Sequence, residues 1–292
     1  MIDLDGEHWA ACLAVSLDAQ MFRLDGSEAT LTVVPKGPWK IGFVDFVAGS
    51  RSDPDLLVAS AQSTARAVGV DVLRFVAERP VTGSRRFARY PQEACRIPDL
   101  QGWQVAATDK GRRTRNRRAR SGLVLRVARL TDAACMHALY VATVVRQGGV
   151  ARYGLAYFEA LAPHAGTVAM LDDEVVGFVC TGHKAGRGLY LHGAQAPLAR
   201  RHHPSDLLFL TMLEAARNRG LQSFDFLASP QPGLLQYKQA WGGERFTEWT
   251  SDLEQGPMGG MFVMAYAAHQ RWRRYVRAGQ EAGTWATNRT SA

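Results

Sequence analysis

The sequence predicts an α/β protein with mixed (α+β) sheets and two similar lobes in tandem. Short apolar, strand-like runs alternate with segments of helical periodicity along most of the 292 residues. The order of these segments also repeats, because each half has a hairpin, a third strand, a helix that ends in glycine and a further strand. The further strands read GVDVLRFVA at 69–77 and GLQSFDFLA at 220–228 and align by eye.

Composition limits the class of protein. Hydrophobic residues make up 47% of the chain and charged residues 21%, which is typical of a soluble globular protein. The start of the chain lacks the pattern of a secretory signal, and no apolar run reaches the ~18 residues of a membrane helix, so we expect a cytoplasmic protein. The four cysteines are widely spaced, without a disulfide or metal-binding pattern.

The chain is strongly basic. Its net charge of +8 and pI near 9.6 indicate an anionic partner, such as nucleic acid, a phosphate-bearing small molecule or a membrane surface. General surface basicity is the alternative, and composition does not separate the two. The oligomeric state has no signature in the sequence.

Local signals define the first lobe, residues 1–105. A helix is expected from Asp53-Pro54, where a capping aspartate precedes proline at the first helical position, to Gly69. The strands expected around it are Ala29–Pro35, Lys40–Val47, Val70–Ala77 and Cys95–Leu100.

The second lobe, residues 106–255, begins with the run KGRRTRNRRAR at 110–120, which has seven basic residues in eleven. A solvated charge run is the alternative, but apolar segments flank it, and we expect a helix and connector with a basic face toward an anionic ligand. The elements that follow are a helical stretch at Leu130–Ala156, a hairpin around Asp172-Asp173, a strand at Gly188–Ala194, a helix at Ser205–Arg219 and a strand at Phe224–Leu227. Residues 256–292 are expected to form an amphipathic helix, Phe262–Arg277, and a frayed tail. Such a helix commonly docks on the core, and contact with an acidic surface is the alternative.

Three phrases carry a resemblance to a known family. The basic segment RRTRNRRARSGLVLRV, the segment LLFLTMLEAARNRGLQSFDFLAS and the segment LLQYKQAWGGE resemble, in order and spacing, motifs of FemAB-like proteins of the GNAT acyltransferase superfamily. The match covers roughly residues 100–250, and the first lobe only by pattern. The resemblance implies a tandem GNAT-like fold and transfer of an activated acyl group to an amine.

The resemblance leaves the donor open between acyl-CoA, used by GNAT enzymes, and aminoacyl-tRNA, used by FemAB peptidyltransferases. The segment ARRHHPS at 199–205 stands where GNAT enzymes have a glycine-rich pyrophosphate loop, so phosphate would be held by Arg200, Arg201 and N–H groups near Ser205 and Asp206. No inserted coiled-coil arm for tRNA is present. We expect acyl-CoA (acetyl-CoA) as co-substrate, with tRNA bound by 110–120 as the alternative and a small-molecule or peptidyl amine as acceptor.

Two residues are predicted to be catalytic. Lys238 lies between the aromatic Tyr237 and Trp241 on a short helix, and its ammonium group is suited to stabilise developing negative charge; the alternative is a surface lysine. Asp225 is suited to orient the amine or to accept its proton, and a buried structural acid paired with an arginine is an equal alternative. Tyr237 is assigned to substrate binding and Trp241 to packing.

Other candidates line the expected acceptor pocket or are set aside. The resemblance places Arg146 and Tyr153 near the acceptor, although a loop without function is an equal alternative. His192 is more typical of a satisfied core histidine than of a base. His202 and His203 lack metal-ligand spacing, so no metal is expected. The remaining alternative is a degenerate, non-catalytic module that binds nucleic acid or a phospho-ligand.

Overall fold

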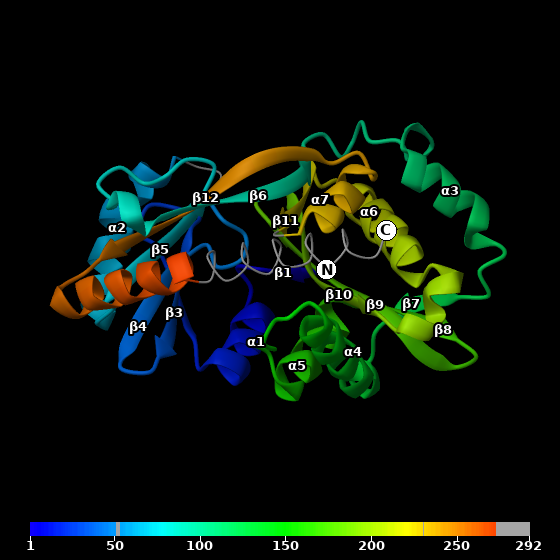
Figure 1. Ribbon diagram of the computed structural model, residues 1–292, viewed down its shortest axis with the longest axis horizontal. Coiled ribbons are helices and arrows are strands. Elements are labelled where there is room, and N and C mark those ends of the chain that lie inside the picture. Colours follow the sequence, from blue (N-terminus) through cyan, green and yellow to red (C-terminus); the bar gives the residue numbers. More distant parts are fainter. Residues whose placement is uncertain (51–52, 230, 273–292) are drawn as a thin grey trace, which may run out of the picture.

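One mixed β-sheet runs through the whole molecule (Figure 1). The computed structural model describes residues 1–50, 53–229 and 231–272. The strand order is β2-β3-β4-β5-β12-β6-β11-β10-β9-β8-β7, and β1 pairs with β9 outside this path. The first-lobe strands are β2 (Gln20–Arg23), β3 (Thr30–Lys36), β4 (Trp39–Val44), β5 (Val72–Ala77) and β6 (Arg89–Ile97). The others are β1 (Ile2–Asp3), β7 (Val124–Val127), β8 (Gly166–Leu171), β9 (Glu174–Lys184), β10 (Arg187–Gln195), β11 (Ser223–Ala228) and β12 (Glu244–Glu254).

The two lobes repeat one topology, which confirms the predicted fold class. In the first, β3 and β4 are antiparallel, and α2 (Pro54–Val68) leads to β5, which is parallel to β4. In the second, β9 and β10 are antiparallel, and α6 (Pro204–Asn218) leads to β11, which is parallel to β10. The helix α2 begins as expected: the Asp53 carboxylate accepts the Asp55 N–H, and Gly69 ends the helix with φ of 71°.

The start of the chain packs mainly against the second lobe, although the Trp9 ring also contacts Phe46 of the first lobe. The division at residue 105 stays a prediction. β1 pairs with β9, and α1 (Glu7–Leu17) packs against α5 (Leu155–Ala165). The buried side chains of Trp9 and Leu13 share one core with Tyr157 and Phe158. Burial of this apolar helix face determines where residues 1–17 lie.

The helices of the second lobe differ from expectation at one place. The stretch expected at 130–156 divides into the short η3 (Leu130–Asp132), α4 (Ala133–Arg146) and the start of α5, because the chain turns at Gly148, where φ is 70°. The predicted helix in the basic run is confirmed as α3 (Asp109–Arg118), capped by the Thr108 hydroxyl, which accepts the Gly111 N–H. The remaining short helices are η1 (Arg86–Ala88), η2 (Val105–Ala107), η4 (Pro197–His202) and α7 (Pro232–Gln239).

A C-terminal helix at residues 257–272 covers the face of the first-lobe sheet opposite α2. Phe262 and Val263 of this helix are buried with Ile41 and Val72 of the sheet. The part of the predicted helix after residue 272 and the predicted tail lie outside the described residues. None of the helices within the described part of the chain is long and apolar enough to cross a membrane.

Candidate functional site

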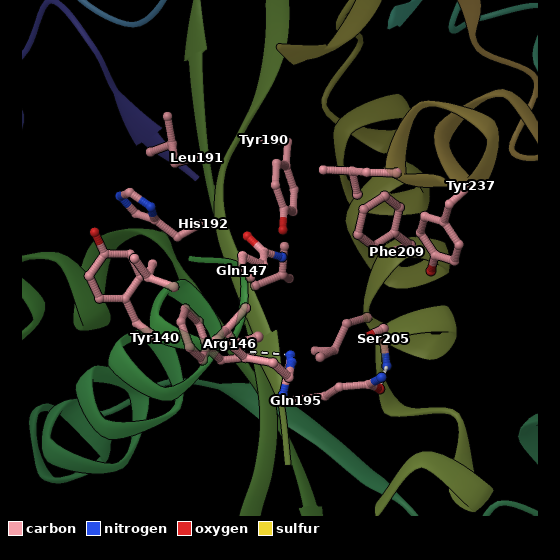
Figure 2. A pocket seen from close by; sticks show the side chains of 18 residues that line it. Tyr140, Arg146, Gln147, Tyr190, Leu191, His192, Gln195, Ser205, Phe209 and Tyr237 are labelled. Atoms are coloured by element: carbon pink, nitrogen blue, oxygen red, sulfur yellow. Dashed lines mark hydrogen bonds between the residues drawn. The ribbon is translucent and has the colours of Figure 1, made fainter. Parts of the chain in front are cut away.

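A cavity opens where β10 and β11 separate (Figure 2). The two strands pair only from Arg187–Ser223 to Leu189–Asp225, whereas β10 continues to Gln195, with an irregularity between Tyr190 and His192. The cavity has a volume of about 410 Å³ and follows residues 190–195 of β10. Ligands in α/β sheets characteristically bind at such points, where neighbouring strands diverge at their carboxyl ends.

The cavity walls are mostly apolar, with a few polar groups. Helix α4 forms one side of the cavity, and α6 and α7 form the other. The apolar lining includes Val144, Phe178, Tyr190, Leu208, Phe209 and Leu234. The polar lining includes Thr143, Arg146, Gln147, His192, Gln195, Ser205 and Tyr237. The walls therefore suit an apolar group of modest size with a polar end.

Two predicted binding residues, Arg146 and Tyr237, line this cavity. Arg146 ends α4 and is exposed, and among the described lining residues it alone carries a full charge. The Tyr237 hydroxyl donates to Oδ1 of Asp206 at 2.9 Å. Burial raises the pKa of Tyr237 well above its usual value, so its hydroxyl remains a neutral donor at physiological pH.

A carboxylate of the chain itself lies at the N-terminus of α6. Asp206, in the first turn of α6, is 5% exposed and accepts from Nζ of Lys110 in α3 at 2.9 and 3.0 Å. The N–H of Ser205 donates to Oε1 of Gln195 at 3.3 Å. A helix N-terminus attracts anions, and here the chain provides the anion itself.

The predicted phosphate-binding residues Arg200 and Arg201 lie on η4, between cavity residues Gln195 and Ser205. Both side chains are exposed, and Nε of Arg201 donates to Nε2 of His202 at 3.0 Å. They border the cavity without lining it.

Predicted Tyr153 belongs to an aromatic group at the α4–α5 side of the cavity. Its ring stacks on Tyr157 at 4.2 Å, and the His192 ring lies edge-on at 5.0 Å. The Tyr157 hydroxyl lies 2.8 Å from Nε2 of His192. Burial lowers the pKa of His192 to about 4 and raises that of Tyr153 to about 12, so both side chains are neutral at physiological pH.

The two predicted catalytic residues lie behind the cavity and do not line it. Lys238 is 1% exposed, and its Nζ donates to the carbonyls of Phe226 and Leu227, the latter at 3.2 Å, and to Oγ of Ser229 at 2.6 Å. Burial lowers the pKa of Lys238 to about 8.

Asp225 supports the same part of β11. Its Oδ1 accepts the Leu227 N–H at 2.8 Å, and its Oδ2 lies 3.9 Å from Nη1 of Arg187. Burial raises the pKa of Asp225. Leu227 has φ of 59°, an unusual conformation for a leucine, at the point where the pairing of β11 with β6 shifts register. Lys238 and Asp225 together hold the irregular end of β11; their direct catalytic roles stay predictions.

Several site residues were missed by the sequence analysis. Gln195 and Tyr190 line the cavity, and the carboxylate of Asp206 organises the start of α6, where only backbone N–H groups had been expected to act. Only their position in the sequence could have indicated them, because they flank the connection between a strand and the helix that leads to the next parallel strand. No group of three or more His, Cys, Asp or Glu side chains suited to a metal occurs among the described residues.

Comparison with known proteins agrees with this architecture. Residues 107–239 match the model of the acetyltransferase (GNAT) domain. FemX has the same fold, with a TM-score of 0.62 and 15% identity over 89% of this chain and 94% of that chain. The C-terminal domain of a putative lysylphosphatidylglycerol synthetase from Agrobacterium fabrum has a TM-score of 0.58 and 16% identity, over 90% of this chain and 91% of that chain. No curated protein matches the chain by sequence.

The matched segment contains α3, both walls of the cavity and Lys238. Residues 107–239 therefore form a GNAT acetyltransferase domain. The chain therefore contains an acyltransferase domain of the GNAT superfamily and has the fold of FemX, as the sequence motifs predicted. Its assignment as an enzyme sets aside the non-catalytic module considered above.

Proposed function

We propose that the chain transfers an acyl group from an activated donor to an amine in the cavity between β10 and β11. The observation that carries this proposal is the separation of the two strands after Leu189, which leaves one edge of β10 facing the cavity. Alternate N–H groups of β10 point away from β9 and toward that edge. They are suited to donate to the oxygen of a reacting carbonyl, a form of stabilisation worth several kcal/mol, roughly, in acyl transfer.

The reaction needs no covalent enzyme intermediate. The amine nitrogen attacks the carbonyl carbon, the new C–N bond forms, and the bond from carbon to the donor's sulfur or oxygen breaks. We assign His192 the Nε2-protonated tautomer, in which Nε2–H donates to Tyr157 and Nδ1 accepts the proton that the amine loses. That proton then passes to the leaving thiolate or alkoxide. Lys238 and Asp225 support this step because they hold the end of β11 in place, apart from β10.

For the donor, the surroundings of α6 favour a polyanion such as aminoacyl-tRNA. Asp206 occupies the helix N-terminus at which a pyrophosphate would otherwise bind, and Lys110 compensates its charge. Six arginines of 112–120 are exposed, and the side chains of three of them form neither an ion pair nor a hydrogen bond with the residues that the structure describes. These three are Arg113, Arg115 and Arg120. The similarity to FemX concerns the fold and does not identify the donor.

Acyl-CoA is the second candidate donor. The observation in its favour is the position of Arg200 and Arg201, which lie on η4 directly before α6 and beside the cavity. Two exposed guanidinium groups are suited to bind the phosphates of a CoA that lies across the surface of η4.

A thermal unfolding comparison distinguishes the two donors. We expect the unfolding midpoint to rise with charged tRNA at low salt and not with acetyl-CoA, because only a bound ligand stabilises the folded state. The matched variants are Arg113→Gln, expected to reduce the tRNA effect, and Arg201→Gln, expected to reduce an acetyl-CoA effect. A rise with acetyl-CoA alone would assign the donor to acyl-CoA. A protein that neither ligand stabilises, and that transfers no acyl group to any amine supplied, would contradict the proposal.

A further inference from the structure

The helix at 257–272 is apolar on two opposite faces. One face packs on the first-lobe sheet through Phe262, Val263 and Ala267, which are 8%, 2% and 6% exposed. With about 100° between successive helical residues, the large side chains of the other face fall in one stripe. That stripe consists of Met258, Met261, Met264 and Trp272, which are 41%, 50%, 57% and 62% exposed.

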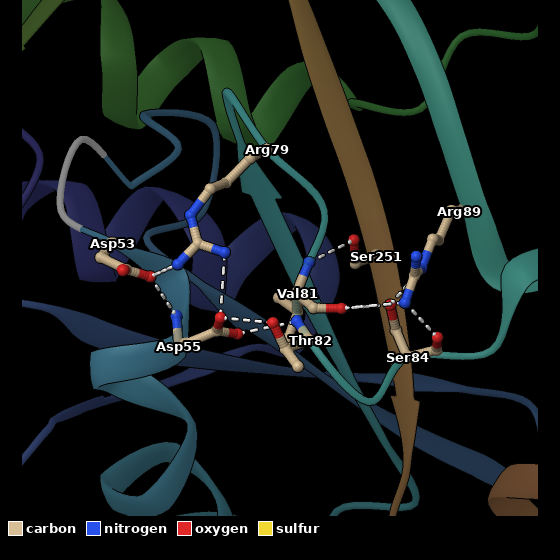
Figure 3. Close-up of polar contacts among 8 residues, drawn as sticks. All are labelled: Asp53, Asp55, Arg79, Val81, Thr82, Ser84, Arg89 and Ser251. Atoms are coloured by element: carbon tan, nitrogen blue, oxygen red, sulfur yellow. Dashed lines mark hydrogen bonds and ion pairs between the residues drawn. The ribbon is translucent and has the colours of Figure 1, made fainter.

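A basic cavity lies between the last turns of this helix and residues 86–90, and Arg271, next to Trp272, is one of its lining residues. It has a volume of about 350 Å³, and its charged lining residues are Arg86, Arg89 and Arg271, without an acidic residue among the described ones. Arg89 is fixed in place by neutral acceptors, since it donates to Oγ and O of Ser84 at 2.9 and 2.7 Å (Figure 3). Arg86 and Arg271 form no ion pair with any residue in the described ranges.

The loop that carries Ser84 is itself tied to the sheet and to α2. Arg79 pairs with Asp53 and Asp55, and the Thr82 hydroxyl donates to Asp55 at 2.7 Å (Figure 3). The Val81 N–H donates to Oγ of Ser251 in β12 at 3.1 Å. These contacts hold the loop that positions Arg89, so this side of the basic cavity has a fixed conformation.

We propose that the methionine stripe and the adjoining arginines form a contact surface for an anionic lipid bilayer. Flexible methionines and a terminal tryptophan are suited to enter the headgroup–acyl boundary, while guanidinium groups bind lipid phosphates. The surface is independent of the proposed acyl transfer.

Charge distinguishes this occupant from a second copy of the chain. A two-fold dimer through the stripe would bring the arginine cavity of each copy near that of the other, because such an interface uses the same patch twice. Like charges placed together oppose association. In an anionic membrane, by contrast, lipid phosphates can neutralise the positive charge of each of these arginines.

Vesicle co-sedimentation tests the proposal on the full chain. We expect binding to phosphatidylcholine vesicles that contain roughly a third phosphatidylglycerol, and little binding to phosphatidylcholine alone. Met261→Asp and Arg271→Glu each change an exposed side chain and are expected to weaken binding about tenfold or more. The matched controls lie on α2, on the opposite face of the sheet: Leu56→Asp and Arg66→Glu are expected to bind as the wild type does.

A spectroscopic measurement adds an independent readout. The fluorescence of Trp272 is expected to shift to the blue on vesicle binding, and Trp272→Phe is expected to remove that shift. Three results would overturn the proposal: no binding to anionic vesicles at low salt, equal losses in the stripe and α2 variants, or a wild-type dimer that Met261→Asp dissociates.

Discussion

The Tyr157 hydroxyl of α5 lies 2.8 Å from Nε2 of His192, a residue of β10 that lines the cavity. Tyr157 is fully buried, and its pKa is raised well above its usual value by burial. The hydroxyl therefore stays neutral and fixes the orientation of the imidazole ring. A histidine that sequence reasoning assigned to the core is thus presented to the cavity with a defined partner.

We expect His192→Gln to lower kcat by about a hundredfold or more, because a positioned base contributes on that order. Tyr157→Phe is expected to cause a smaller loss, about tenfold, since the imidazole remains and only its tautomer is released. Steady-state kinetics on purified variants with matched circular dichroism spectra measure both effects. Unchanged kcat in His192→Gln would exclude this histidine as the proton acceptor.

The same histidine is expected to make stability depend on pH. Burial lowers its folded-state pKa from 6.5 to about 4. Between these values the unfolded chain binds the proton and the folded chain does not, so the His192 contribution to the free energy of unfolding falls as pH falls from 6.5 to 4. Urea unfolding at pH 5 and pH 7 measures it as the difference between the wild type and His192→Gln. A difference that does not vary with pH would contradict the buried, neutral histidine.

Lys238→Met is expected to lower the free energy of unfolding by about 1–3 kcal/mol, because the carbonyls of Phe226 and Leu227 lose a buried donor. Denaturant unfolding measures this loss. If Lys238 also has the catalytic role that the sequence predicted, kcat of the folded variant falls as well. If folded Lys238→Met keeps the wild-type kcat, the role of Lys238 is limited to holding β11 in place.

Neutral substitutions on α3 are expected to weaken tRNA binding without unfolding the protein. Arg113 and Arg115 are exposed, so Gln at either position changes charge and not packing. Each variant is expected to reduce the slope of log K against log salt by about 1, the signature of one lost phosphate contact. Filter binding over a salt series measures the slope. A wild-type slope in both variants would place the tRNA elsewhere.

Glu248 is expected to destabilise the fold at neutral pH. Burial raises its pKa from 4.5 to about 7, although Oε2 accepts from Nε2 of Gln92 at 2.9 Å. Between pH 4.5 and 7 the folded chain holds the proton more tightly than the unfolded chain, so this contribution to stability declines as pH rises through that range. Glu248→Gln is expected to be more stable than the wild type at pH 8, on the order of 2 kcal/mol, and closer to it at pH 4.5. Equal unfolding free energies at pH 8 would contradict the raised pKa.

The sequence predicted those parts of the fold that depend on local signals. The start of α2 follows from Asp53 and Pro54, and the repeat follows from two similar strands, 69–77 and 220–228. The basic run formed a helix because Thr108 caps it and because Gly111 and Thr114 allow one side to be buried. Such signals act over a few residues, and they suffice to place elements along the chain.

The site depends on contacts that no local pattern encodes. Asp206 joins Lys110, 96 residues earlier, and Tyr237, 31 residues later. The burial that turns Lys238 toward the carbonyls of β11 arises only when α7 packs on the sheet. Sequence reasoning therefore identified Lys238 as a distinctive residue and did not foresee that its Nζ would be used within the protein.

The pairing of β12 with both β5 and β6 bears on how substrates reach the cavity. Since β6 also pairs with β11, backbone hydrogen bonds run without interruption from one lobe to the other. Rotation of the lobes about a hinge would have to break some of these backbone hydrogen bonds. Leaving buried peptide groups without partners costs free energy. We therefore expect the donor and acceptor of the proposed reaction to enter through local movements at the rim, in η4 and in the 147–154 connection, while the sheet stays rigid.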